Sequence, residues 1–224
     1  MSNPFSDFNA LSRVNMLTGI ANALFPGGGT VTFTDDLVPA FSRIQLTDDF
    51  VTRLTNTRNW WNLDRSEASR RTYIDNFIYY AMALSRSQSL IVTPEESIAP
   101  NMARIGSGRI DYLLSAINEN TAVPIYNPSV IIEAKAFLGD APVGENQLLA
   151  EMMTLWQITA SQQGLAHGIL TDGRYWKFYE IAMASGYIFA SRIYDSRNDQ
   201  GLITIMSVLT KFFRLYDSGN SSFT

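Results

Sequence analysis

The chain has 224 residues, 46% of them hydrophobic, with a formal net charge of −4 and no cysteine. This length suits one large domain or a core with an extension, and the composition excludes wholesale disorder, disulfide bonds and cysteine-based zinc sites. No apolar run is long enough to span a bilayer, so we expect a protein without a membrane partner in an intracellular setting, the cytoplasm or nucleus.

Residues 1–62 carry no motif that points to a chemistry, and we interpret them as an N-terminal extension packed on the core. Apolar residues at helical spacing predict a helix over Phe8–Leu24, which ends at the glycine-rich breaker segment 26–29. A short strand is expected at Thr30–Phe33 and a short helix at Thr47–Thr55.

The clearest helix prediction covers Asp64–Ser87, where an apolar stripe follows a polar start. Asp64 followed three residues later by Glu67 fits a capping box. Glu67 therefore has two possible roles at this point: it caps its helix, or it reaches a functional site from the start of that helix. The sequence does not decide between them.

Three strands are expected next, over Ser89–Val92, Arg104–Ala116 and Val130–Ala136, with a solvated turn at residues 94–96 after the first. Side chains on a strand alternate between faces, so Glu133 and Lys135 share one face of a strand that is otherwise apolar. The chain has only three lysines, and burying either charge alone is costly. Lys135 inside such a strand therefore calls for a chemical reason.

The second of these strands carries Asp111 within Gly108–Leu114. If it pairs with the third strand through the connection 118–128, Asp111 and Glu133 converge beside Lys135. Two carboxylates at one point are ligands that a hard divalent cation prefers. The alternative is a buried ion pair between Glu133 and Lys135 with Asp111 in a turn.

The remaining chain predicts a helix, a hairpin and a closing helix. Gln147 lies in the first turn of the helix expected over Gly144–Gln163. Asp172-Gly173 is a hairpin signal between two strands, and a further edge strand precedes the last helix. The expected ranges are Leu165–Leu170, Tyr175–Ile181, Tyr187–Tyr194 and Leu202–Tyr216, with a flexible tail at 218–224. The lone His167 reads better as a satisfied core histidine than as a ligand.

This order of elements predicts an α/β fold with a mixed sheet flanked by helices, the core occupying residues 63–217. Around the strands, the wording Gly-Arg-Ile-Asp-Tyr and Ile-Ile-Glu-Ala-Lys, with Gln147 on the next helix, resembles the PD-(D/E)XK nuclease superfamily. The likeness covers residues 64 to 182 and is greatest to the nuclease modules of type I restriction subunits and their stand-alone relatives. It implies a restriction-endonuclease-like core.

The resemblance places the family's first acid on Asp111 and its E-x-K element on Glu133, Ala134 and Lys135. It implies a nuclease that uses Mg²⁺ or Mn²⁺ to hydrolyse DNA, with RNA as the alternative substrate. The implied metal ligands are Asp111, Glu133 and the carbonyl of Ala134. Lys135 would position water, and Gln147 would lie beside the site. The third acid would be Glu67, with Glu96 as its rival.

One departure from the family pattern is that Asp111 follows Arg109-Ile110 rather than a proline. Arginine suits phosphate contact, and the basic residues expected to bind nucleic acid are Arg70, Arg71, Arg109, Arg174 and Lys177. A homodimer is compatible with the sequence, which does not fix the oligomeric state. The main alternative is a catalytically inactive module of this fold that binds nucleic acid or a protein partner.

Overall fold

A computed structural model of the chain describes residues 30–33, 44–60, 63, 66–86, 89–98, 108–117, 124–135, 144–159, 165–182 and 185–217. The helices are α3 (Asp48–Trp60), α4 (Glu67–Ser85), α5 (Glu145–Thr159) and α6 (Asp199–Tyr216). The strands are β1 (Thr30–Phe33), β2 (Leu90–Ile98), β3 (Gly108–Ile117), β4 (Pro124–Ala134), β5 (Leu165–Thr171), β6 (Tyr175–Ala182), β7 (Tyr187–Ala190) and β8 (Tyr194–Asp195). The helix expected at Phe8–Leu24 and the tail at 218–224 lie outside these residues.

The strands form one mixed sheet in the order β1-β7-β6-β5-β4-β3-β2, and β8 pairs with β6. Strands β2, β3 and β4 are joined antiparallel, whereas β4 and β5 run parallel because α5 crosses between them. The pair β5–β6 is an antiparallel hairpin. Its turn contains Gly173 with a φ of 87°, a left-handed conformation that glycine adopts without strain. The α/β fold with a mixed sheet flanked by helices is confirmed.

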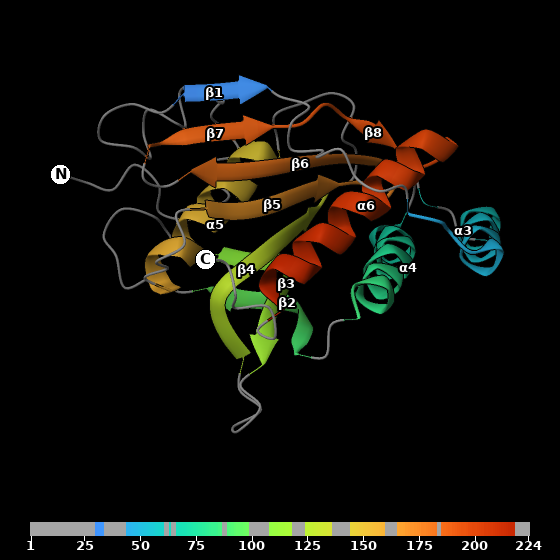
Figure 1. The fold of residues 1–224 in the computed structure, drawn as a ribbon, viewed down its shortest axis with the longest axis horizontal. Helices are drawn as coiled ribbons and strands as arrows, with labels where there is room; N and C mark the ends of the chain where they lie inside the picture. The colour runs from blue at the N-terminus through green and yellow to red at the C-terminus, as the bar shows by residue number, and fades with distance from the viewer. Residues whose placement is uncertain are drawn as a thin grey trace.

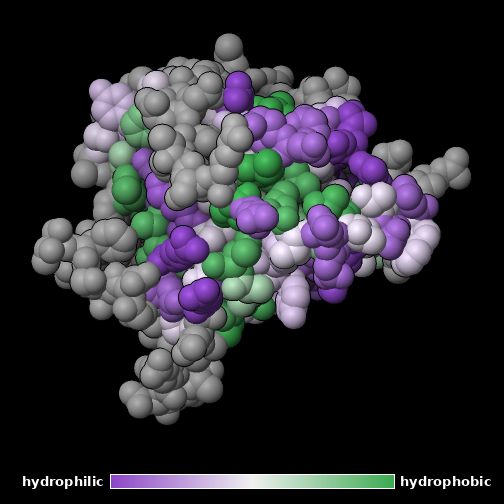
Figure 2. Space-filling model, turned by 45° about the vertical axis from the view of Figure 1, so that its right-hand side comes forward, coloured by the Kyte–Doolittle hydropathy of each residue, from purple (hydrophilic) through white to green (hydrophobic). Residues whose placement is uncertain are grey.

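Helices cover both faces of the sheet (Figure 1). Helices α4 and α6 pack on one face, where the core includes Tyr112, Ile132 and Trp176. Helix α5 packs on the other face, against Leu113, Ile131 and Leu170. Strand residues alternate between these two clusters, as the pleat requires. On the outer surface in Figure 2, hydrophobic side chains gather in the middle of the view and hydrophilic ones border them.

Several expected boundaries were wrong. Ser66, not Asp64, caps α4: its side chain accepts from the Ser69 N–H, so Glu67 is the first helical residue. Strand β2 continues through the expected turn at 94–96, because an edge strand tolerates both a proline and the positive φ of Glu95. Strand β4 already begins at Pro124.

The N-terminal region and the last strands also differ from expectation. Strand β1 of the predicted extension joins the sheet beside β7, in parallel, so β7 is an inner strand and not an edge. The range expected as one strand, Tyr187–Tyr194, divides into β7 and the start of β8. Among the described residues, no helix has the length and apolar character needed to cross a membrane.

Candidate active site at the end of strands β3 and β4

The residues singled out in the sequence meet where β3 and β4 lie side by side. The two strands are antiparallel neighbours, with Tyr112 opposite Ile132. One position beyond that pair stand Asp111 and Glu133. The Ala134 N–H donates to Asp111 Oδ2 over 2.8 Å, which fixes the aspartate against the end of β4. The convergence expected for these two strands is therefore present.

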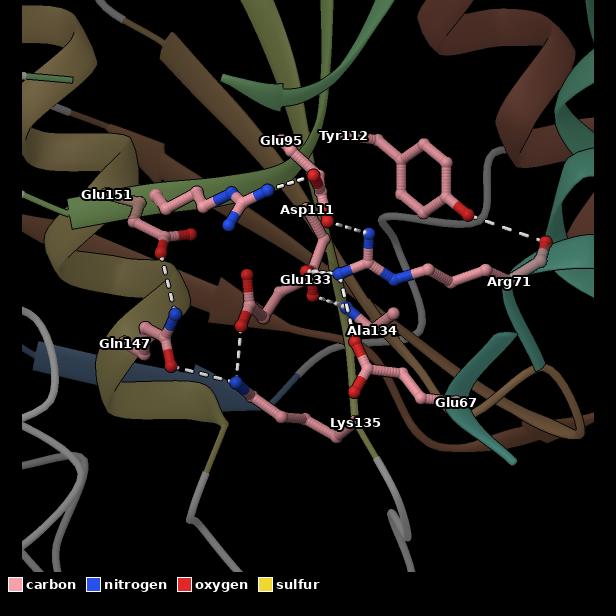
Figure 3. A network of polar contacts seen from close by, with 11 residues as sticks. Glu67, Arg71, Glu95, Asp111, Tyr112, Glu133, Ala134, Lys135, Gln147 and Glu151 are labelled. Carbon is pink, nitrogen blue, oxygen red and sulfur yellow. Dashed lines mark hydrogen bonds and ion pairs between the residues drawn. The ribbon is translucent and has the colours of Figure 1, made fainter. Parts of the chain in front are cut away.

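A chain of hydrogen bonds runs from β4 to α5 on the α5 face of the sheet (Figure 3). Lys135 Nζ donates to Glu133 Oε1 and, over 2.8 Å, to Gln147 Oε1. The Gln147 Nε2 in turn donates to Glu151 Oε1 over 2.9 Å. Glu151 follows Gln147 by four residues, so both side chains leave the same face of α5.

Gly144, immediately before α5, lets the lysine lie close to the helix start. A Cβ at this position would come within 2.8 Å of Lys135 Cγ and 2.6 Å of Leu170 Cδ1, both too close for a real contact. The absence of a side chain at residue 144 thus leaves the space that the Lys135 stem occupies. The glycine at residue 144 therefore contributes to the position of Lys135 in the site.

The two glutamates of this network are deeply buried. Glu133 is 1% exposed. Burial is the largest cause of its pKa shift and raises the pKa of its carboxyl to about 7, although the charge of Lys135 opposes the shift. Burial also raises the pKa of Glu151, and the charge of Glu133 raises it further. Two desolvated carboxylates repel each other, so the neutral form of one is favoured.

One carboxyl oxygen of each of these two glutamates lies buried without a hydrogen-bond donor from the described residues. These oxygens are Glu133 Oε2 and Glu151 Oε2. The two carboxyl groups affect each other's pKa. Two carboxylate oxygens can share a hydrogen bond only if one of them holds a proton. Protonation of one glutamate would therefore supply the missing donor.

Asp111 is held by a different partner. Its Oδ1 is 2.5 Å from an Arg71 guanidinium nitrogen that comes from the first turns of α4. The same guanidinium lies 3.0 Å from Glu67 and 2.9 Å from Glu95. Arg71 therefore stands among three carboxylates, on the opposite side of Asp111 from the Lys135 network (Figure 3).

The predicted metal ligands differ in whether they lie in the site. Asp111 and Glu133 lie in it, and Ala134 contributes a backbone N–H to Asp111. Glu67 is 68% exposed and reaches Asp111 only through Arg71. Glu96 lies on β2 opposite Ile110, and its neighbour Glu95 is the β2 acid that binds Arg71.

A divalent cation nevertheless suits this donor set. The buried Glu133 Oε2 receives no hydrogen bond from the part of the chain that the structure describes. A carboxylate such as Asp111 can accept more than the two bonds that it makes there. Mg²⁺ is often held by only one or two carboxylates, with waters and substrate phosphates completing its shell. In the described part of the chain, no group of three or more Asp, Glu, His or Cys side chains is arranged to hold a metal.

The basic residues expected to bind nucleic acid, other than Arg71, are spread along the sheet and helices. Arg70 donates to the Leu63 carbonyl over 3.1 Å, and Arg109 pairs with Glu95. Arg174 lies 3.7 Å from Asp195 and stacks on Tyr175. Lys177 pairs with Glu145 at the start of α5. Of the five, Arg71 is the one that pairs directly with Asp111 among the described residues.

Sequence reasoning missed Glu151 and Glu95. Glu151 carried a usable signal, because it follows Gln147 at i+4 on a predicted helix and so shares its face. Glu95 carried none, since a turn was expected at that position. In comparisons with known proteins, no family model matches the chain and no curated protein matches it.

Proposed function

We propose that this protein is a metal-dependent nuclease that hydrolyses phosphodiester bonds in DNA, with RNA as the alternative substrate. One observation carries the proposal. The buried Glu133 and the partly buried Lys135 form an ion pair at the end of β4, directly beside Asp111 on β3, and an α5 glutamine fixes the lysine. Charged groups that lie close together and whose pKa values are shifted by burial are typical of functional sites. The resemblance to the PD-(D/E)XK superfamily supports the same proposal.

Each side chain has a distinct role in this proposal. Asp111 and Glu133 would hold Mg²⁺ or Mn²⁺, which when bound polarises the phosphate and lowers the pKa of water. Lys135 uses two of its three N–H donors on Glu133 and Gln147, and we assign the third to the attacking water. Gln147 keeps the lysine from rotating away. The arrangement therefore orients water and places positive charge near the scissile phosphate.

The test combines ion binding with cleavage. Mn²⁺ or Mg²⁺ should raise the thermal unfolding midpoint of the protein, because a ligand of the native state stabilises it. Single-stranded, double-stranded, circular and branched DNA and matched RNAs should be assayed in parallel. Asp111→Asn, Glu133→Gln and Lys135→Ala should each abolish cleavage. Asp49→Asn, an exposed acid on α3, serves as the control and should leave it unchanged.

Full cleavage by any of the three site variants would overturn this mechanism. So would a protein whose unfolding midpoint and cleavage ignore both ions.

The second candidate is an inactive module of this fold that binds nucleic acid or protein. It is favoured by one observation: both oxygens of Asp111 are bonded within the chain, to Arg71 and to the Ala134 N–H. An inactive module should bind its partner equally well with and without divalent ions. Electrophoretic mobility shifts in EDTA and in Ca²⁺ separate this candidate from the nuclease.

A further inference from the structure

Arg71 supplies the positive charge nearest to Asp111. Its side chain is 22% exposed and that of Asp111 is 17% exposed, so their 2.5 Å contact is partly shielded from water. The other two partners of the guanidinium, Glu67 and Glu95, are much more exposed. An ion pair gains strength as water is excluded, so the bond to Asp111 is the strongest of the three.

A divalent ion bound by Asp111 would compete with this arginine. The cation would approach the carboxylate to which the guanidinium is already bound, and two positive charges on one carboxylate repel each other. The arginine has somewhere to go, because Glu67 and Glu95 already hold its nitrogens at 3.0 and 2.9 Å on the outer side. It can leave Asp111 without losing every carboxylate partner.

We propose that Arg71 is an exchangeable counter-ion: it neutralises Asp111 in the metal-free protein, and a divalent cation displaces it outward, where it contacts the substrate phosphate. This inference rests on the proposed function. A planar guanidinium suits bidentate phosphate contact. Arg71 then acts twice, first against premature ion binding and then in favour of substrate.

The adjacent arginine offers a matched control. Arg70 has the same charge and lies on the same helix, yet its guanidinium donates to the Leu63 carbonyl and, among the described residues, forms no ion pair with Asp111. Arg70→Ala therefore removes one positive charge from the same region and leaves the Asp111 pairing intact. General effects of net charge on ion affinity appear in both variants, whereas competition appears only at residue 71.

The experiment measures Mn²⁺ affinity of the full chain without nucleic acid, by electron paramagnetic resonance of free Mn²⁺. Arg71→Ala should bind Mn²⁺ about tenfold more tightly than the wild type, since it removes the competing charge. Arg70→Ala should stay within about twofold. Arg71→Gln keeps a hydrogen-bond donor for Asp111 without the charge, and should also bind more tightly, which guards against a folding defect in the alanine variant.

A second readout tests the outward role. In Ca²⁺, the affinity of Arg71→Ala for a fluorescent oligonucleotide should fall about fivefold despite its tighter ion binding, because a phosphate contact is lost. The inference is wrong if both residue 71 variants bind Mn²⁺ as tightly as the wild type does, or more weakly. Arg71 would then be a fixed structural partner of Asp111, and the proposed function would be unaffected. Failure of all four proteins to bind Mn²⁺ overturns the proposed metal site as well.

Discussion

Two buried charged networks lie on opposite faces of the same sheet, and they differ in how completely they are paired. On the α6 face, His167 Nδ1 meets the Tyr216 hydroxyl and its Nε2 lies 2.9 Å from Glu180 Oε2. Both ring nitrogens thus have partners. On the α5 face, Glu133 and Glu151 each keep a buried oxygen to which none of the described residues donates.

The carboxyl pKa values of the two networks shift in opposite directions. The hydrogen bond from His167 lowers the pKa of Glu180, whereas burial raises the pKa of Glu133 to about 7. A lowered carboxyl pKa means that the folded state favours the charge, and a raised one means that it opposes the charge. The folded state therefore favours the charged form of Glu180 and opposes that of Glu133, and the second pattern agrees with a site retained for the proposed function.

The largest predicted effect comes from neutralising each acid in turn. At pH 8, Glu133→Gln should reduce cleavage about a thousandfold or more, because a proposed metal ligand is lost. The same variant should raise the unfolding midpoint, because it removes a desolvated charge. Glu180→Gln should do the reverse: cleavage unchanged and a lower midpoint. Parallel cleavage and thermal unfolding assays measure both, and a destabilised Glu133→Gln would remove the distinction between the networks.

The next effect concerns the relay through α5. Glu151→Leu removes the acceptor that orients the Gln147 amide, so Lys135 loses its fixed partner, and cleavage should fall roughly 10- to 100-fold, the range typical of outer-shell groups. Glu151→Gln keeps an acceptor for Gln147 and can donate to Glu133 Oε2. It should retain cleavage within about threefold of the wild type, by the same reasoning.

Rescue by the glutamine variant is the decisive control for the relay. If leucine and glutamine at residue 151 reduce cleavage equally, the negative charge of Glu151 matters and its orienting role is wrong.

A smaller effect is the pH dependence of stability without metal. The folded-state pKa of Glu133 lies above the usual 4.5, so its folded form holds the proton more tightly than the unfolded chain does. Its contribution is complete below pH 4.5 and is lost as the pH rises toward about 7. The lowered pKa of Glu180 acts the other way, contributing above its unfolded value and losing that contribution as the pH falls.

Urea unfolding in EDTA between pH 4 and 8 tests these signs. Glu133→Gln should flatten the decline toward neutral pH, and Glu180→Gln should flatten the loss on the acid side. A wild-type stability that rises steadily through pH 5–7, unchanged by Glu133→Gln, would contradict the raised pKa.

The sequence predicted the α5-face site better than its surroundings. Glu133 and Lys135 were found because charge in an apolar strand is a local pattern. Gln147 was singled out through the family resemblance, since a polar residue in a first helical turn is ordinary by itself. Glu151 was missed although it follows Gln147 by four residues on the predicted helix and hydrogen-bonds to it. Arg71 was found as a basic residue, but its pairing with Asp111 joins residues 40 apart and has no sequence signature.

The fold, like the site, was predictable where it depends on local sequence patterns and not where it depends on long-range pairing. The Asp172-Gly173 turn and the helices α3, α4, α5 and α6 were expected from local patterns, and these predictions were correct in kind. Strand β1 was expected as a strand, yet its place beside β7 depends on a parallel pairing across more than 150 residues, for example Thr30 with Tyr187. Long-range pairing of this kind is selected by edge complementarity in the folded sheet and leaves no periodic trace in either segment.

The smallest predicted effect tests whether the α6 network is truly structural. Tyr216→Phe removes the hydroxyl that pairs with His167 Nδ1 and keeps the ring against the buried histidine. One buried ring nitrogen loses its partner, so the free energy of unfolding should fall by about 1 kcal/mol. Cleavage should not change, because Tyr216 lies on the opposite face of the sheet from Lys135. Chemical denaturation and a cleavage assay suffice, and a loss of cleavage without a loss of stability would place His167 in the catalytic machinery after all.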